Sequence, residues 1–118
     1  MRRRTFVAGV LVATAAGRAQ AQQPAKVYRI AIVYPSTPVA EQRKAAAESP
    51  RGKAFWGELR RLGLVEGRNV VVERYSSGGR TEDFAELARD VVRSNPDVIY
   101  TDGTRFMLAF KAATTTIP

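Results

Sequence analysis

The sequence contains no cysteine and no histidine. Without cysteine there is no disulfide, no thiolate metal site, no cysteine nucleophile and no lipid-modified cysteine to tether an exported protein to a membrane. Without histidine the chain lacks the residue used most often for general base catalysis near neutral pH, for serine triads and for zinc or iron sites. An enzyme is therefore disfavoured, and we expect a soluble protein without a metal or cofactor.

The composition is that of one ordinary globular domain. Of the 118 residues, 45% are hydrophobic and 25% are charged, which argues against a disordered or fibrous chain. The formal net charge is +8, and a basic excess of this size raises the question of nucleic-acid or anionic-membrane binding. The answer depends on the N-terminal segment.

Residues 1–21 have the three regions of a secretory signal peptide. Three arginines precede an apolar stretch, Phe6 to Ala16, that is too short to cross a bilayer as a permanent helix. Ala19-Gln20-Ala21 places small residues at the positions that a signal peptidase recognises before its cleavage site. We therefore predict cleavage after Ala21 and a periplasmic product. Because all three regions agree in spacing, this interpretation is favoured over an N-terminal amphipathic or membrane-anchoring helix.

The residues leave the export route open. The stretch from Arg3 to Val7 resembles the twin-arginine motif, and the glycine and threonine in the apolar stretch suit that route. Export by the Sec pathway fits the same segment.

Removal of the signal peptide halves the charge. Four arginines leave with it, so 15 basic residues remain against 11 acidic ones, a net charge of +4. The remaining cations are spread along the chain, and no basic run is interleaved with aromatic residues as in single-strand binders. We therefore expect no nucleic-acid partner, and nucleic-acid binding stays only a weak alternative.

Residues 27–118 are predicted to alternate between strands and helices, after a polar leader at 22–26. This order implies parallel strands joined by right-handed crossovers, with helices on both faces of a three-layer α/β fold. Thr81 is expected to accept backbone donors at the start of the second helix. The predicted strands are Val27 to Tyr34, Asn69 to Tyr75 and the run after Asp97; the predicted helices are Lys53 to Leu62, the segment from Thr81 and the segment after Thr104.

The connection from Pro35 to Gly52 is unusually long for a strand-to-helix loop and carries three prolines. Within it, Val39 to Glu48 is compatible with a short exposed helix. Long connections in compact domains tend to be functional or disordered.

Polar residues follow the predicted strands at their carboxyl ends, where ligands bind in open parallel sheets. The third strand opens onto Thr101, Asp102, Gly103 and Thr104, just before a helix whose first amides suit a carboxylate. Asp102 is then placed to pair with a ligand ammonium, and the threonines offer hydroxyls. The alternative is that Thr104 caps the helix and Asp102-Gly103 only turns the chain. Ser36-Thr37 and, more weakly, Ser76-Ser77 end the other two strands.

Other motifs give no site. Ser77-Gly78-Gly79 lacks the downstream residues of a phosphate loop, and no dinucleotide fingerprint follows the first strand. The acidic residues between Glu82 and Asp90 alternate with arginines, which is typical of a solvated, ion-paired helix face. Phe55 and Trp56 have the spacing of core residues and are interpreted as core rather than as ligand-stacking groups.

Three segments carry a resemblance to a known family. Ala54 to Tyr75, "AFWGELRRLGLVEGRNVVVERY", and the later "LARDVVRSNPDVIYTDGT" and "KAATTTIP" resemble the N-terminal part of bacterial ABC transporter substrate-binding proteins, which have the type I periplasmic-binding-protein fold. The most specific pieces are Leu62 to Asn69 and Lys111 to Pro118. The resemblance covers nearly all of the chain after the signal peptide.

The resemblance implies two α/β lobes that close on a small solute, such as an amino acid, and deliver it to an ABC permease in the inner membrane. It places Pro35, Ser36 and Thr37, together with Asp102 to Thr104, where the first lobe meets its ligand. Some similar proteins bind aromatic amino acids. Leu64 and the bulky stretch from Arg105 to Phe110 depart from the family pattern, so the ligand is not assigned.

The length departs from the family as well. A two-lobe receptor needs more than a hundred residues in each lobe, whereas this sequence ends at Pro118, where a fourth strand is expected to begin. We therefore expect a partial, apparently truncated first lobe, and a monomer. Two rival interpretations remain, a nonfunctional fragment or interaction module and a small exported α/β enzyme.

We predict that the native periplasmic product starts at Gln22. Intact mass spectrometry of the product recovered from the periplasm measures this directly. A mass matching Gln22 to Pro118 confirms the cleavage and identifies a one-lobe product, whereas a much larger mass identifies a fragment of a longer receptor. A product that retains residues 1–21 would contradict the signal-peptide prediction.

Overall fold

The structure is a computed structural model that describes residues 26–118. The predicted signal peptide and residues 22–25 of the leader lie outside the described residues. The elements in chain order are β1 (Tyr28–Tyr34), α2 (Val39–Glu48), α3 (Pro50–Arg61), β2 (Val70–Ser76), the 3-10 turn η1 (Thr81–Asp83), α4 (Phe84–Arg93), β3 (Val98–Thr101) and α5 (Thr104–Ala113).

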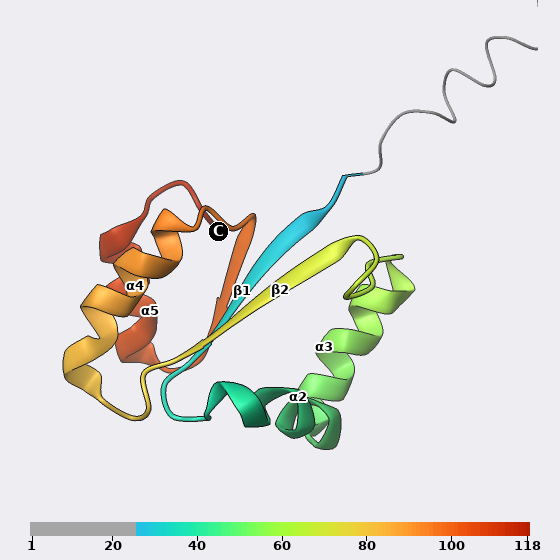
Figure 1. Cartoon of the computed structure of the whole chain (residues 1–118), viewed down its shortest axis with the longest axis horizontal. Coiled ribbons are helices and arrows are strands. Elements are labelled where there is room, and N and C mark those ends of the chain that lie inside the picture. The colour runs from blue at the N-terminus through green and yellow to red at the C-terminus, as the bar shows by residue number, and fades with distance from the viewer. Residues whose placement is uncertain (1–25) are drawn as a thin grey trace, which may run out of the picture.

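The three strands form one parallel sheet in the order β2-β1-β3. In the central strand, Ile30 is level with Val72 of β2 on one side and with Val98 of β3 on the other. Helices α2 and α3 cover one face of the sheet, and α4 and α5 cover the other (Figure 1). The prediction of a parallel α/β fold with helices on both faces is confirmed.

The face under α4 and α5 has a closed core. Ala31 and Val33 of β1 are fully buried there, together with apolar residues of α4 and α5. Phe106 stacks on Phe84 with ring centroids 4.1 Å apart, and Phe110 stacks on Phe106 at 5.5 Å. The predicted periodicity of both helices is confirmed by this packing.

The face under α2 and α3 is only partly closed. Ile30 and Ile32 of β1 and Val70 of β2 are buried, but the aromatic side chains that α3 lays over them, Phe55 and Trp56, are half-buried. No residue of α3 is fully buried. Because the same strand alternates its side chains between the two faces, β1 belongs to both cores.

Helix α3 begins three residues earlier than predicted. Pro50 occupies its first turn, where a missing backbone N–H costs nothing, and Ser49 Oγ accepts a hydrogen bond of 2.9 Å from the Gly52 N–H. Helix α2 has the predicted bounds, and all its residues are exposed or half-buried except Gln42, which is 2% exposed. The expectation of a mostly exposed helix is confirmed, with that one exception.

The predicted cap at Thr81 is wrong. The segment Thr81–Asp83 is a 3-10 turn, Arg80 stands at its start, and no side chain in the described part of the chain caps either this turn or α4. The acidic face of this region is ion-paired as expected, because Arg80 pairs with Asp83 at 2.8 Å and Arg93 pairs with Asp90.

The turn from Leu62 to Asn69 is fastened by Asn69. Its Oδ1 accepts from the Val65 N–H at 2.8 Å, and its Nδ2 donates to the Gly63 carbonyl at 2.8 Å. Gly63 has a φ of 83°, a left-handed conformation that closes the helix, and the Leu64 N–H donates to the Leu59 carbonyl at 2.8 Å. The turn therefore fixes where β2 begins.

Arg29, near the amino end of β1, ties this strand to β2 and to the end of α4. Arg29 of β1 pairs with Glu73 of β2, and its guanidinium donates to the Ser94 carbonyl at 2.6 Å after α4. The Arg29 side chain lowers the pKa of the Glu73 carboxyl, with a further contribution from the Tyr75 hydroxyl, which donates to Glu73 at 2.8 Å. This cluster anchors α4 to the sheet at the edge opposite the predicted ligand site.

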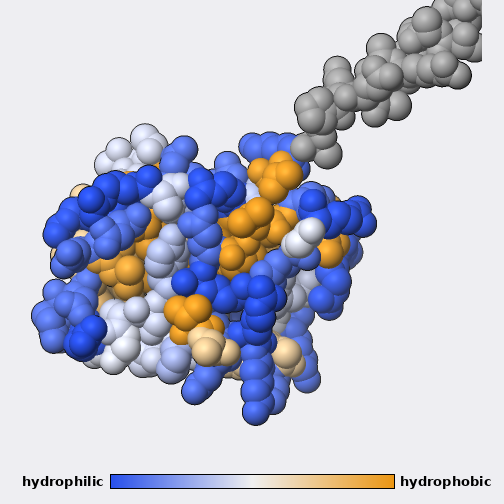
Figure 2. Space-filling model, in the orientation of Figure 1, coloured by the Kyte–Doolittle hydropathy of each residue, from blue (hydrophilic) through white to orange (hydrophobic). Residues whose placement is uncertain are grey.

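The C-terminal residues lie along the outer side of β3. The Ile99 N–H donates to the Pro118 carbonyl at 2.8 Å, which is the contact expected of a segment that approaches a fourth strand position. Among the described residues no helix has both the length and the apolar character needed to cross a membrane. Figure 2 shows polar and charged side chains over most of the viewed face, with separate apolar patches between them.

A charged cluster joins α2 to β2. The Glu66 carboxylate accepts two hydrogen bonds from Arg43 of α2 and two from Arg74 of β2, at 2.9 to 3.1 Å. The side chain of Arg74 is only 9% exposed. Hydrogen bonding from Arg74, with a smaller contribution from Arg43, holds the pKa of Glu66 below its ordinary value of 4.5.

We predict opposite effects for two glycine substitutions in α3. A Cβ on Gly52 would lie 2.1 Å from the Ala46 carbonyl oxygen of α2, so G52A must push the two helices apart and should lower the free energy of unfolding by about 1–3 kcal/mol. A Cβ on Gly57 meets nothing within 4 Å, so G57A should raise it by about 1 kcal/mol. Urea denaturation followed by circular dichroism measures both, and equal stability of the two variants would contradict the close helix contact.

We also predict a stability that depends on Glu66 at acidic pH. The folded pKa of Glu66 is lowered, so its contribution is complete above the unfolded value of 4.5 and is lost as the pH falls through the folded value. E66Q should lower the free energy of unfolding by about 1–3 kcal/mol at neutral pH, and the difference from wild type should shrink between about pH 5 and pH 3.

The control for Glu66 is E86Q, because Glu86 is exposed on α4 and takes part in no ion pair among residues 26–118. Urea denaturation at a series of pH values should give E86Q the same pH dependence as wild type. A difference in stability between E66Q and wild type that stays constant with pH would show that the ionised Glu66 carboxylate is not the source of that difference.

Candidate functional site

The carboxyl ends of the three strands meet at one edge of the sheet, which we call the strand-end edge. Pro35 directly follows the central strand and lies where the loops that follow β1, β2 and β3 come together. Its carbonyl oxygen accepts 2.7 Å hydrogen bonds from the Ser77 hydroxyl and from the Gly79 N–H. On the other side, a Cβ on Gly103 would lie 3.7 Å from Pro35 Cγ. The predicted convergence of the loops follows from the parallel order of the strands.

The residues predicted after the third strand separate into two kinds. The Thr101 hydroxyl donates to the Val33 carbonyl at 3.0 Å, so it joins β3 to the central strand. Asp102, Gly103 and Thr104 are exposed at the strand-end edge. The first of the four is therefore held by the sheet, and the other three face solvent.

Helix α5 begins at this edge without a capping side chain. Gly103 stands at the N-cap with a φ of 91°, a conformation that favours glycine. No side chain of residues 26–118 bonds to the first amides, and the first turn carries no acidic residue. The alternative that Thr104 caps the helix is wrong, because Thr104 is the first residue of the helix itself. The positive end of α5 therefore opens toward the edge.

Asp102 has a partner that the sequence did not indicate. Its carboxylate lies 3.3 Å from a guanidinium nitrogen of Arg51, at the start of α3. Both side chains are more than half exposed, at 52% and 71%. An ion pair so open to water contributes about 0–1 kcal/mol, so Arg51 holds Asp102 only weakly.

Of the residues predicted after the other strands, Ser36 is exposed and Thr37 is half-buried. The Thr37 carbonyl accepts a hydrogen bond of 3.2 Å from Gln42 Nε2. Ser77, which was the weaker candidate, is 5% exposed and serves the fold, because its hydroxyl is held by Pro35. The structure thus brings Ser36 and Thr37 to the same edge as Asp102 to Thr104.

A buried glutamine lies directly beneath the edge. Gln42 Nε2 also donates to the Tyr75 carbonyl of β2 at 2.8 Å, while Oε1 is buried and has no hydrogen-bond partner among the described residues. Gln42 lines a cavity of about 10 Å³, enough for a single water molecule. Tyr34 and Tyr100 line the same cavity in an edge-to-face pair. Burial, with the neighbouring Tyr100 and Asp102, raises the pKa of the Tyr34 phenol.

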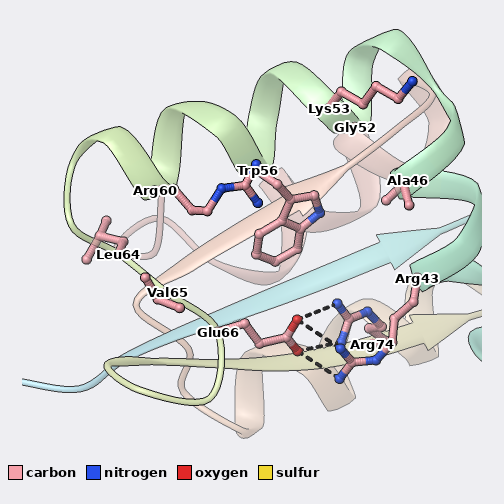
Figure 3. A pocket seen from close by; sticks show the side chains of 11 residues that line it. Arg43, Ala46, Gly52, Lys53, Trp56, Arg60, Leu64, Val65, Glu66 and Arg74 are labelled. Carbon is pink, nitrogen blue, oxygen red and sulfur yellow. Dashed lines mark hydrogen bonds and ion pairs between the residues drawn. The ribbon is translucent and has the colours of Figure 1, made fainter.

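A larger cavity lies away from the strand-end edge, between α2, α3 and the loop before β2 (Figure 3). Its volume is about 460 Å³, and we call it the basic cavity. Trp56 lies in it, with the Arg74 guanidinium carbon 5.9 Å from the ring centroid. The interpretation of Phe55 and Trp56 as core is confirmed for their packing on the sheet, but Trp56 also faces this cavity. Its polar lining residues are Arg43, Lys53, Arg60, Glu66 and Arg74.

No grouping of three or more acidic side chains suited to hold a metal occurs within 26–118. The groups that the strand-end edge presents to solvent are hydroxyls, one carboxylate and the amides of a helix N-terminus. These groups are suited to orient a small zwitterionic molecule.

The chain is similar to a solved structure from Vibrio cholerae O1 biovar eltor, which is described as a conserved domain protein. The two sequences are 26% identical and the structures superpose with a TM-score of 0.62 over 79% of this chain. The match covers 29% of the Vibrio chain, so the present chain spans less than a third of that protein's length. No protein-family model matches the chain, and no curated protein matches it. The comparison supports the parallel α/β fold and a relation to part of a larger protein.

Proposed function

We propose that the chain forms the first lobe of the periplasmic solute-binding component of an ABC-type importer, with the type I periplasmic-binding-protein fold. The observation that carries the proposal is the strand-end edge, where an uncapped helix N-terminus and an exposed carboxylate lie beside hydroxyl-bearing loops. The predicted signal peptide and the resemblance of Leu62 to Asn69 and Lys111 to Pro118 to that family support the same assignment.

In this proposal the solute is a small amino-acid-like molecule. Its carboxylate binds the free amides at the start of α5, because the helix dipole favours an anion there. Its ammonium pairs with Asp102 in place of the exposed Arg51, which is a weak competitor for the carboxylate. Ser36, Thr37 and Thr104 supply further hydrogen bonds, and Thr101 positions the loop through β1.

The rest of the receptor follows from the resemblance. A second α/β lobe closes over the strand-end edge and surrounds the solute, and the loaded receptor, a monomer, passes it to an inner-membrane permease. The Vibrio chain is more than three times as long as the matched segment, which leaves room for such a lobe. The export signal at 1–21 would place the protein in the periplasm.

A small exported enzyme is the rival function, and turnover distinguishes the two. We expect the protein to bind an amino acid reversibly and to return it unchanged. Isothermal titration calorimetry against a panel of amino acids measures binding, and mass spectrometry of the recovered solute detects any conversion. A converted solute would contradict the receptor assignment.

We predict that D102N weakens the binding of the best amino acid about tenfold or more, because a hydrogen bond to a charged group contributes about 1.5–3 kcal/mol. The matched control is E58Q, which removes an exposed, arginine-paired carboxylate of α3 that lines neither the basic cavity nor the small cavity beside Gln42. Calorimetry should give E58Q the affinity of wild type. Equal affinities of D102N and wild type would place the solute elsewhere on the chain.

A further inference from the structure

The basic cavity carries an excess of positive charge. Four cationic side chains line it, against the single carboxylate of Glu66. That carboxylate is already occupied, because it accepts hydrogen bonds from both Arg43 and Arg74. The cavity therefore has three positive charges that its own acidic residue does not balance.

Two of the cations have no partner of their own among residues 26–118. Lys53 and Arg60 form no ion pair and no side-chain hydrogen bond with other described residues. They are seven residues apart on α3, about two helical turns, so both lie on the side of the helix that borders the cavity. The Arg60 guanidinium extends toward Trp56, whereas the Lys53 side chain extends away from Trp56 at the rim (Figure 3). Arg43 and Arg74 each use only part of their five N–H donors on Glu66, so they keep donors for another acceptor.

Much of the lining of the cavity is apolar, and the ring of Trp56 gives it a flat aromatic surface. Trp56 projects from α3 between the helix and the pair of Glu66 and Arg74 (Figure 3). Its ring is half-buried, and Leu64, Val65 and Ala46 complete the apolar lining. An aromatic ring of a ligand is stabilised by stacking on such a surface, in addition to the effect of the area it buries. The volume of about 460 Å³ lies within the range of small-molecule pockets.

We propose that the basic cavity is a second binding site, for a small aromatic carboxylate. The flat ring of the ligand packs against Trp56, its carboxylate accepts from Arg60, and Lys53 adds positive charge at the rim. An anion suits the site because the surplus charge is positive, and a flat apolar body suits it because a hydrated inorganic ion would leave Trp56 and Leu64 uncovered. The site is separate from the strand-end edge, since Asp102 and Thr104 do not line it.

The chain contains one tryptophan, and it lies in this cavity. Intrinsic fluorescence of the purified protein therefore reports on the site directly. Titration with benzoate should give a saturable change in Trp56 emission. Benzamide, which keeps the ring but carries no charge, and acetate, which keeps the charge but has no ring, should each bind at least tenfold more weakly.

Variants locate the benzoate on the chain. R60Q should weaken benzoate binding at least fivefold, and K53Q should act in the same direction. The matched control is K44Q, which removes an exposed cation from α2 that does not line the cavity and should leave the affinity unchanged. Circular dichroism confirms that each variant is folded. W56F removes the fluorescent signal, so its benzoate affinity is measured by calorimetry and should fall.

Each outcome decides the proposal. Saturable binding that R60Q weakens and K44Q does not supports the second site. A fluorescence change that rises linearly without saturation, or equal losses in R60Q and K44Q, overturns it, because general charge attraction would then explain the effect. Loss of benzoate binding in D102N also overturns it, since the anion would lie at the strand-end edge; the amino-acid measurement on D102N tests the importer proposal independently.

Discussion

The structure depends on the position of β1 as the only one of the three described strands that pairs on both sides. A central strand is covered above and below, so its successive side chains must all be apolar or small. Ile30, Ala31, Ile32 and Val33 satisfy this condition and are each at most 5% exposed. The same constraint brings the end of β1 between the ends of its two neighbours. Pro35 therefore gathers the loops of β2 and β3 around it, and the candidate site is a consequence of strand order.

The two faces of the sheet differ in how fully they are covered, and this difference explains where the basic cavity lies. Helices α4 and α5 pack through three stacked phenylalanine rings and leave Ala31 and Val33 fully buried. Helix α3 instead covers its face with long aromatic side chains that stay half-buried, above which charged side chains project. A cover of this kind leaves room beside it. The basic cavity occupies that room, whereas the smaller hollows beside α4 and α5 lie at the margins of those helices, one next to the end of β2 and one next to the C-terminal residues.

Elements with a regular apolar pattern could be predicted from the sequence. Features that depend on a single contact could not. The apolar periodicity of α4 and α5 and the runs of β-branched residues in the strands predicted the sheet and the polar edge. The start of α3 was missed because the cap of Ser49 and the place of Pro50 lie inside a proline-rich stretch that resembles a loop. Gln42 was missed for a different reason: its neighbours in α2 are exposed, and only the approach of β2 buries it. The pattern of neighbouring residues in the sequence does not indicate a contact with a strand so far along the chain.

The pair of helices α2 and α3 connects the two candidate sites physically. At one end, Gln42 holds the loop after β1 through the Thr37 carbonyl, and Arg51 reaches Asp102 at the strand-end edge. At the other end, Arg43 binds Glu66 on the wall of the basic cavity. The two helices are held together where Gly52 lies against Ala46, a contact with no room for a side chain. Because closely packed elements shift as units, a movement of this pair would change the geometry of the strand-end edge and of the basic cavity together.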